Sequence, residues 1–385
     1  MAALPEFPDN CTGCSACGAV CPVDAIVLTA DAEGFLYPQV DREICTSCGL
    51  CLKICPVLHP PAVGEKEPCT YAALSQDETS RQASSSGGVF AVLARHVLAK
   101  GGKIAGAAWA DDFVLRHCLV DREEDLTALL GSKYIQSHPG AVLREVQTAR
   151  QQGLPVLFAG TPCQTAGLQS FLREETGDGL WCVDLVCHGV PSPLAWAFYV
   201  RELETRHGAP ITHASFRAKT AGWRQFSIRV EFKNGQVYEM SHRQDPYMWL
   251  FLKNMNLRRS CYQCPFKGWT RASDLTLADF WGVESLTPAL DDDRGTSLVL
   301  VHSNAGAVLL ESCSAQLKLE SVEVRAALHE NPLAFRSVER PAGREQFFSL
   351  LGKRKTKDMI QILLQAKSGI QPGSLSRLKQ LLNRR

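Results

Sequence analysis

The chain has 385 residues, which is enough for two or three domains, and its formal net charge is +1. This balance gives no overall reason to expect nucleic acid or a membrane surface as a partner. The 16 cysteines are too sparse for a disulfide scaffold, which begins at roughly 8–10% cysteine in a short secreted chain. Residues 1–10 lack the basic and apolar parts of a signal peptide, and no apolar run has the length of a membrane span. We therefore expect a soluble cytoplasmic protein without a transmembrane segment.

Residues 1–60 repeat one cysteine spacing. The first copy is Cys11-x2-Cys14-x2-Cys17-x3-Cys21-Pro22 and the second is Cys45-x2-Cys48-x2-Cys51-x3-Cys55-Pro56. In this pattern three close thiolates bind one [4Fe–4S] cluster, and the fourth cysteine binds the other cluster. We predict one cluster on Cys11, Cys14, Cys17 and Cys55, and a second on Cys45, Cys48, Cys51 and Cys21. The alternative is zinc bound by paired CxxC motifs. This segment resembles bacterial-type ferredoxins with two clusters.

The rest of the chain predicts a linker at 61–70, a mixed α/β domain at 71–350 and a basic helical tail at 351–385. Within the large domain we predict, in chain order, a helix at 89–98, a strand at 104–109, helices at 126–130 and 141–151, a strand at 156–159, a helix at 164–173 and a strand at 181–186. From Ile211 the pattern changes to an antiparallel insertion, with a hairpin turn at Asn234-Gly235. The predicted fold class is α+β.

Four of the other cysteines lie in polar turns marked by glycine or proline. Cys163 and Cys187 each follow a predicted buried strand, and Cys261 and Cys264 form a CxxC motif. Loops at the carboxyl ends of such strands converge on one crevice, so we predict that these four thiolates hold a third iron–sulfur cluster. The alternatives are small buried hydrophobic residues or, for the CxxC motif, a redox disulfide. The remaining four, Cys69, Cys118, Cys182 and Cys313, are assigned to packing.

Several phrases of the large domain resemble the coenzyme F420 hydrogenase/dehydrogenase beta-subunit family. They are Leu157-Phe-Ala-Gly-Thr-Pro-Cys-Gln, Cys187-His-Gly, Arg259-Ser-Cys-Tyr-Gln-Cys-Pro-Phe-Lys-Gly, Arg271-Ala-Ser-Asp-Leu-Thr-Leu-Ala-Asp-Phe-Trp-Gly and Gly295-Thr-Ser-Leu. The resemblance covers about residues 69–345 and departs at Ala278, where we expect glycine. It implies a domain that binds FAD and a [4Fe–4S] cluster of its own.

The chain has no GxGxxG fingerprint, so the flavin site is predicted elsewhere. The helix start at Ser84-Ser85-Ser86-Gly87-Gly88 offers backbone N–H groups and a positive dipole end, which suit the pyrophosphate of FAD. The loop with Lys133, Tyr134 and Gln136 adds a cation, an aromatic ring and an amide, and Thr161 completes the predicted cofactor-binding set. The alternatives are an ordinary helix cap and a solvated lysine.

Polar residues beside the scattered cysteines supply further candidates. His188 adjoins Cys187 and is a candidate proton donor, although a histidine beside a cysteine is more often a structural hydrogen-bonding group. Lys267 and Arg271 follow the CxxC motif and either bind an anion, ease reduction of the cluster, or pair with Asp274 and Asp279.

Two functions fit these patterns. The favoured one is an FAD-dependent iron–sulfur oxidoreductase that links an F420-like deazaflavin or another organic substrate to ferredoxin or a partner enzyme. The rival is a non-catalytic electron-transfer subunit that docks to a separate enzyme. In the tail, residues 353–385 contain nine Lys or Arg and one Asp. We expect the first tail helix to cap the domain and the second, after Pro372, to be a loosely held segment.

Overall fold

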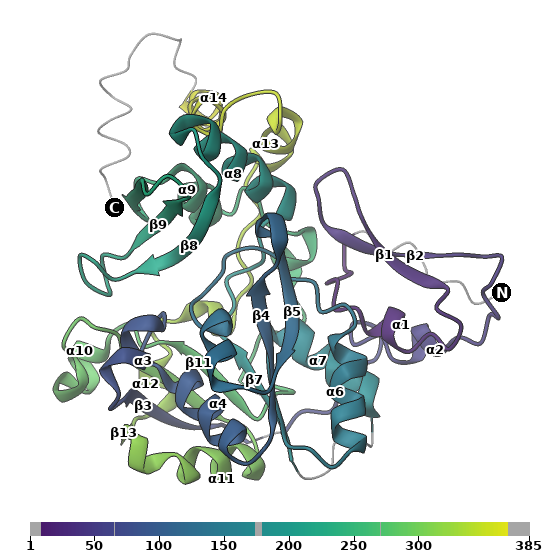
Figure 1. The fold of residues 1–385 in the computed structure, drawn as a ribbon, viewed down its shortest axis with the longest axis vertical. Coiled ribbons are helices and arrows are strands. Elements are labelled where there is room, and N and C mark those ends of the chain that lie inside the picture. Colours follow the sequence, from purple (N-terminus) through teal and green to yellow (C-terminus); the bar gives the residue numbers. More distant parts are fainter. Residues whose placement is uncertain (1–8, 65, 174–178, 270, 369–385) are drawn as a thin grey trace.

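Three sheets organise the computed structural model, which describes residues 9–64, 66–173, 179–269 and 271–368 (Figure 1). A two-stranded sheet belongs to the N-terminal ferredoxin-like region, an eight-stranded mixed sheet forms the centre, and a three-stranded antiparallel sheet lies at one end of it. The predicted combination of a dicluster region, a mixed α/β domain and an antiparallel insertion is confirmed at this level. The second predicted tail segment lies outside the described residues.

The N-terminal region projects from the side of the molecule and is built as two similar halves (Figure 1). Each half has a cysteine loop followed by a four-residue helix, α1 (Ala16–Ala19) or α2 (Leu50–Lys53). Both helices begin directly after a residue with positive φ, Ser15 at 67° and Gly49 at 72°. The hairpin of β1 (Ile26–Ala30) and β2 (Leu36–Val40) joins the two halves.

The central sheet has the strand order β13-β3-β12-β11-β7-β6-β4-β5. Its strands β4, β6, β7 and β11 are parallel, and β5, β12 and β13 pair with their neighbours in the antiparallel sense. The strands are β3 (Cys69–Ser75), β4 (Lys103–Trp109), β5 (Leu115–Val120), β6 (Val156–Ala159), β7 (Leu180–Leu185), β11 (Leu275–Asp279), β12 (Ser297–Val301) and β13 (Leu317–Ser321).

Helices cover both faces of this sheet because its strands are apolar on both sides. On one face Leu93 and Leu310 pack over Leu157 and Val299, and on the other Val146 and Leu168 pack over strands β4, β6 and β7. The helices of this domain are α3 (Glu78–Ala83), α4 (Val89–Ala99), α5 (Glu123–Leu126), α6 (Val142–Gln151), α7 (Pro162–Leu172), α10 (Val283–Leu286), α11 (Asn304–Ser312) and α12 (Val324–Ala327).

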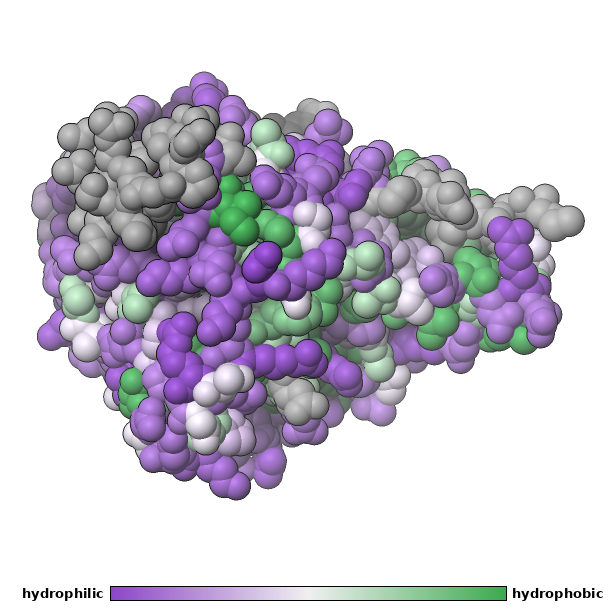
Figure 2. Space-filling view, turned by 90° about the horizontal axis from the view of Figure 1, so that it is seen from above, coloured by the Kyte–Doolittle hydropathy of each residue, from purple (hydrophilic) through white to green (hydrophobic). Residues whose placement is uncertain are grey.

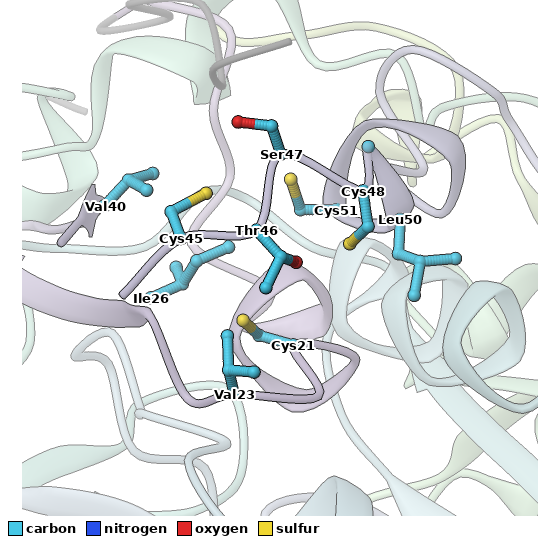
Figure 3. Close-up of a pocket in the computed structure, with 11 residues that line it drawn as sticks. Cys21, Val23, Ile26, Val40, Cys45, Thr46, Ser47, Cys48, Leu50 and Cys51 are labelled. Carbon is cyan, nitrogen blue, oxygen red and sulfur yellow. The ribbon is translucent and has the colours of Figure 1, made fainter. Parts of the chain in front are cut away.

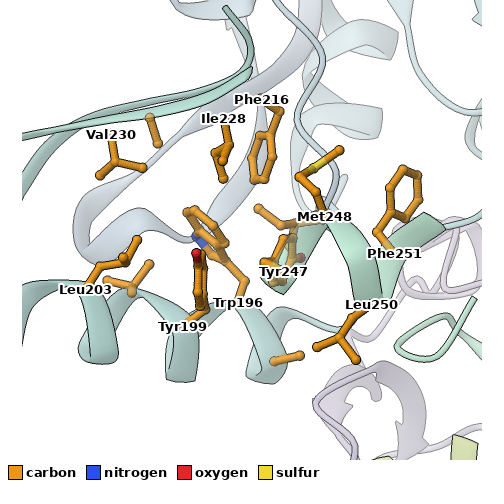
Figure 4. Packing of buried hydrophobic residues seen from close by; sticks show 14 of the residues in the cluster. Trp196, Tyr199, Leu203, Phe216, Ile228, Val230, Tyr247, Met248, Leu250 and Phe251 are labelled. Atoms are coloured by element: carbon orange, nitrogen blue, oxygen red, sulfur yellow. The ribbon is translucent and has the colours of Figure 1, made fainter. Parts of the chain in front are cut away.

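A second core lies beyond the carboxyl edge of the sheet, where β8 (Ile211–Ala218), β9 (Ser227–Phe232) and β10 (Val237–Ser241) pack on four helices. The helices are α8 (Pro193–His207), α9 (Pro246–Leu252), α13 (Arg344–Leu350) and α14 (Thr356–Ser368). Figure 4 shows Trp196 and Tyr199 of α8 facing Phe216 and Tyr247 in this core. The tight turn between β9 and β10 uses Gly235 at φ 81°.

Short 3₁₀ helices complete the described chain. They are η1 (Asp111–Phe113), η2 (Thr127–Leu129), η4 (Arg259–Gln263), η5 (Pro288–Leu290), η6 (Ser314–Gln316) and η7 (Pro332–Ala334). Met359, Ile360 and Leu363 of α14 are buried in the second core, so this first tail helix covers the domain. Within the described ranges, the helices are too short or too polar to cross a bilayer.

The carboxyl ends of the parallel strands meet between the two cores. Cys163 follows β6, Cys187 follows β7, and Asp279 ends β11. The end of β3 at Ser75 and the start of β12 at Ser297 lie at the same edge, because β12 runs antiparallel to both β3 and β11. This edge therefore gathers residues from segments that are far apart in the sequence.

Candidate functional site

Four cysteines of the two repeats line one cavity (Figure 3). They are Cys21 from the first repeat and Cys45, Cys48 and Cys51 from the second, with Val23, Ile26 and Val40 beside them. We call them the distal quartet. Cys48 is exposed, and its pKa is lowered, first by the backbone N–H of Leu50. This quartet is thus open to solvent on one side.

The other four cysteines of the repeats form the proximal quartet, made of Cys11, Cys14, Cys17 and Cys55. Burial raises the pKa of Cys14, and the neighbouring sulfurs of Cys17, Cys11 and Cys55 raise it further. Burial, followed by Cys11 and Cys55, raises the pKa of Cys17 to about 12. Cys51 also raises the pKa of Cys17, so the two quartets are neighbours. The chain thus brings each fourth cysteine to the opposite repeat, as the spacing predicts.

The residues around the proximal quartet fit an iron–sulfur cluster. The hydroxyl groups of Thr12 and Ser15 are buried and have no partner among the described residues, although both lie between cysteines of the first repeat. Cluster sulfides accept hydrogen bonds of this kind. When clusters are bound, they supply one-electron transfer.

Cys163, Cys187, Cys261 and Cys264 also come together, and we call them the main-domain quartet. Burial raises the pKa of Cys163, and Cys264 and Cys187 add to the effect. Burial also raises the pKa of Cys261, and Cys187, Cys163 and Cys264 raise it further. Thr161 caps α7, and its hydroxyl lies 3.1 Å from the Cys163 sulfur. The predicted flavin contact at Thr161 thus belongs to the surroundings of this quartet.

Two cations border the main-domain quartet. Burial raises the pKa of Cys187, whereas Lys267 and Arg271 lower it. Lys267 donates to the carbonyl oxygens of Cys187 and Leu333, and Arg271 lies 3.6 Å from the buried carboxylate of Asp184. The alternative in which these cations pair with Asp274 and Asp279 is wrong. Asp274 instead accepts from Ser303 and from the Cys182 backbone, and Asp279 pairs with Arg217.

The main-domain quartet and the proximal quartet meet across α7. A Cβ atom at Gly167 would lie 2.8 Å from the Cβ atom of Cys14 and 3.0 Å from its sulfur. Cys163, one helical turn before Gly167, has its pKa raised in part by Cys14. Only glycine permits this approach of α7 to the first cysteine loop. The three quartets thus follow one another in the order main-domain, proximal, distal.

Polar contacts fix the ferredoxin-like region against the large domain. Gln136 donates to the carbonyl oxygen of Thr12 at 3.1 Å and accepts from Arg258 at 3.0 Å. Arg344, which is fully buried, pairs with Glu33 at 2.5 Å. Gln136 was predicted to bind flavin, but both ends of its amide form hydrogen bonds within this interface.

The remaining predicted flavin residues lie at the carboxyl edge, and several of their polar groups are engaged. The Gly87 N–H donates to the Ser297 hydroxyl, the Ser85 hydroxyl accepts from the Ser132 N–H, and Ser86 donates to Thr296. Gly88 adopts φ 84° and caps α4. The hydroxyl of Ser84 is buried and has no partner among the described residues.

The loop after Gly131 is also held by protein groups. The ammonium of Lys133 donates to the carbonyl oxygens of Leu130 and Gly131, and burial lowers its pKa to about 8. The ring of Tyr134 stacks on Phe251 at 4.6 Å, and its hydroxyl accepts from Arg217. These contacts order the loop beside the sheet edge.

Comparison with known protein families assigns two segments of the chain. Residues 10–58 match the 4Fe-4S dicluster domain, and residues 154–326 match the C terminus of the coenzyme F420 hydrogenase/dehydrogenase beta subunit. The chain therefore joins a dicluster iron–sulfur domain to a beta-subunit domain, and its role is in electron transfer.

Whole-chain comparisons add little to this assignment. A chain of the F420-reducing [NiFe] hydrogenase complex from Methanosarcina barkeri has 17% sequence identity and a TM-score of 0.48, over 77% of this chain and 92% of that chain. No curated protein matches the sequence.

Within the beta-subunit domain, His188 occupies a structural environment. Its Nε2 atom lies 2.7 Å from the Asn254 side-chain oxygen, and its ring packs on Phe251. Burial lowers the pKa of His188. Assigning Cys69 to packing is wrong because its side chain is exposed at the start of β3, whereas Cys182 and Cys313 are buried.

Sequence reasoning missed the residues that join the beta-subunit domain to the dicluster domain. Gly167 was detectable, because an isolated glycine inside a helix lowers helix stability and often marks close packing. Arg258 and Arg344 had no such signal, since their partners in the dicluster domain, Cys11 and Glu33, lie more than 200 residues away in the sequence. Lys219 was also missed: burial lowers its pKa to about 7, and it donates to the carbonyl oxygens of Arg81, Ser86 and Arg294.

Proposed function

We propose that the chain is an iron–sulfur flavoprotein oxidoreductase that carries single electrons through three [4Fe–4S] clusters. The observation that carries the proposal is the contact of Cys14 with α7, which carries Cys163 in its first turn. A cluster on the main-domain quartet would lie next to the cluster on the proximal quartet. Electrons would then reach the distal quartet, where Cys48 is exposed.

A flavin at the carboxyl edge is the second part of the proposal. FAD supplies the exchange between two-electron and one-electron chemistry. Its support is the placement of Ser84–Gly88 and Lys133 at the edge that also carries the main-domain quartet. Two buried polar groups there, the Ser84 hydroxyl and the Nε atom of Arg217, have no partner among the described residues.

The proposed substrate class is suggested by the matched family. The family that residues 154–326 match is named for coenzyme F420, so we propose a deazaflavin or another organic hydride donor or acceptor as the substrate. The exposed distal quartet suits ferredoxin or a partner enzyme as the one-electron partner. With these partners the protein would work in the cytoplasm, in either direction of electron flow.

A non-catalytic electron-transfer subunit is the alternative. The same chain of three quartets would serve it, because a protein that only relays electrons needs clusters and no flavin. Bound flavin therefore separates the two functions.

The test is anaerobic purification followed by cofactor analysis of the full chain. We expect about twelve irons, as three cubanes require, together with one FAD. Ser84→Ala should weaken FAD binding while leaving the iron content unchanged. Gly87→Asp is a poor test, because a Cβ atom at Gly87 would lie 2.7 Å from the Ser297 nitrogen and disturb the fold itself.

The control is Ser312→Ala, which removes an exposed hydroxyl that donates only within α11. It should leave both cofactors unchanged. Full iron content without FAD, even after incubation with FAD, would favour the electron-transfer subunit.

A further inference from the structure

Among the residues that the structure describes, one buried arginine lacks the carboxylate partner that the others have. Among the described residues five arginines are buried, and four of them pair with an acidic side chain. The pairs are Arg81–Asp292, Arg217–Asp279, Arg271–Asp184 and Arg344–Glu33. The fifth, Arg258, has a relative exposure of 0% and no carboxylate of the described residues within ion-pair distance. Within the described part of the chain, no acidic side chain balances its positive charge.

Arg258 lies against the loop that carries the proximal quartet. Its Nε atom donates to the carbonyl oxygen of Cys11 at 2.7 Å, and its Nη2 atom donates to Leu36 at 3.0 Å. The guanidinium also stacks on Tyr37, 4.1 Å from the ring centroid. A Cβ atom at Gly13 would lie 3.2 Å from Arg258 Nη1. These contacts fix the charge beside the first cysteine loop.

Taking an unpaired guanidinium out of water is strongly unfavourable unless a negative charge lies close by. Four thiolates around a [4Fe–4S] core carry a net charge of about −2 when oxidised and about −3 when reduced, and this charge influences the reduction potential. We propose that Arg258 is the counter-ion of the cluster on the proximal quartet and raises the reduction potential of that cluster. The inference depends on the dicluster part of the proposed function and is independent of the flavin and of the main-domain quartet.

Arg258 should affect the reduction potential of the proximal cluster more than that of the distal cluster. The distal quartet opens to solvent at Cys48, where water and salt screen neighbouring charges. Arg258 is shielded from solvent, so its attraction for the added electron is screened far less. The proximal cluster then accepts electrons more readily than its burial alone would allow.

The experiment is a redox titration of the anaerobic full-length protein, followed by electron paramagnetic resonance. We expect Arg258→Gln to lower the ratio of reduced to oxidised proximal cluster about tenfold at a fixed potential, a shift of about 59 mV for one electron. The distal cluster, identified by the signal that Cys48→Ala removes, should keep its potential. Arg258→Lys should restore most of the proximal potential, because it retains the charge.

Gln136→Met is the matched control, since it removes an uncharged side chain that hydrogen-bonds to Thr12 and Arg258 at the same interface. It should shift the proximal potential far less than Arg258→Gln. An unchanged proximal potential in Arg258→Gln, or an equal shift in Gln136→Met, would overturn the proposal.

If Arg258→Gln assembles no proximal cluster, Arg258→Lys tests whether the lost charge is the cause. Retention of that cluster by the lysine variant supports the counter-ion, and its loss there as well overturns it. Failure of the proposed oxidoreductase is separate, because it appears as absent FAD while both ferredoxin-domain clusters and their potentials are still measured.

Discussion

The two cysteine repeats have the same local geometry and opposite surroundings. Each cysteine loop has one glycine and one serine at positive φ, Gly13 and Ser15 in the first and Ser47 and Gly49 in the second. Gly13 packs against Gln136 and Arg258, whereas a Cβ atom at Gly49 would have nothing within 4 Å. Cys14 is only 9% exposed, whereas Cys48 is exposed. Sequence spacing thus sets the loop, and docking of the large domain decides which loop is buried.

This difference assigns distinct roles to two similar halves. The buried repeat lies between the main-domain quartet and the distal quartet, so it suits transfer within the protein. The exposed repeat lies on the projecting lobe, which Figure 2 shows with hydrophobic and hydrophilic side chains interspersed. Val27 and Ile44 of this lobe are 60% and 49% exposed. This surface is where we expect a redox partner to exchange electrons.

The largest expected effect comes from filling the contact between α7 and the first loop. Gly167→Leu places a side chain where Cys14 now lies, and overpacking of this kind destabilises by about 1–3 kcal/mol. We expect loss of the proximal cluster, about four irons, with slower reduction of the distal cluster. Iron analysis and stopped-flow absorbance measure both effects. The control is Gly64→Leu, where a Cβ atom has nothing within 4 Å. Equal iron content in Gly167→Leu and the native protein would disprove the close approach.

A second expected difference concerns chemical attack on the two ferredoxin-domain clusters. Oxidation of cluster ligands follows exposure, so ferricyanide with a chelator should destroy the distal cluster at least about fivefold faster than the proximal one. Electron paramagnetic resonance of samples reduced after timed exposure follows each signal. Simultaneous loss of both signals would remove the distinction between a buried and an exposed repeat.

The smallest expected effect is at the exposed rim of the docking interface. Arg144 donates to the carbonyl oxygens of Gly18, Ala19 and Cys21 and pairs with Asp24. Because this arginine is partly exposed, Arg144→Ala should lower stability by about 0.5–1 kcal/mol, or roughly 2 °C in the thermal loss of cluster absorbance. Arg95→Ala, which removes exposed pairs of the large domain, serves as the control. A loss of several times this size would place Arg144 among the essential interface residues.

The sequence predicted those groupings of cysteines that depend on local spacing and strand order. The grouping of Cys21 with the second repeat and Cys55 with the first follows from the CxxCxxCxxxCP pattern, and the meeting of Cys163 with Cys187 follows from strand order. The sequence could not predict that the large domain packs over the first repeat, because Arg258 and Gln136, which make the contacts, come from separate loops. Gln136 was therefore assigned to the flavin, although its amide contacts Thr12.

The most direct test of the relay is magnetic coupling between reduced clusters in the full-length protein. We predict that the proximal signal is broadened by both neighbours. Removing the main-domain cluster with Cys163→Ala and Cys264→Ala should abolish one broadening and leave the coupling to the distal cluster intact. A proximal signal unchanged by this double substitution, or an unchanged iron content, would contradict the order of main-domain, proximal and distal quartets.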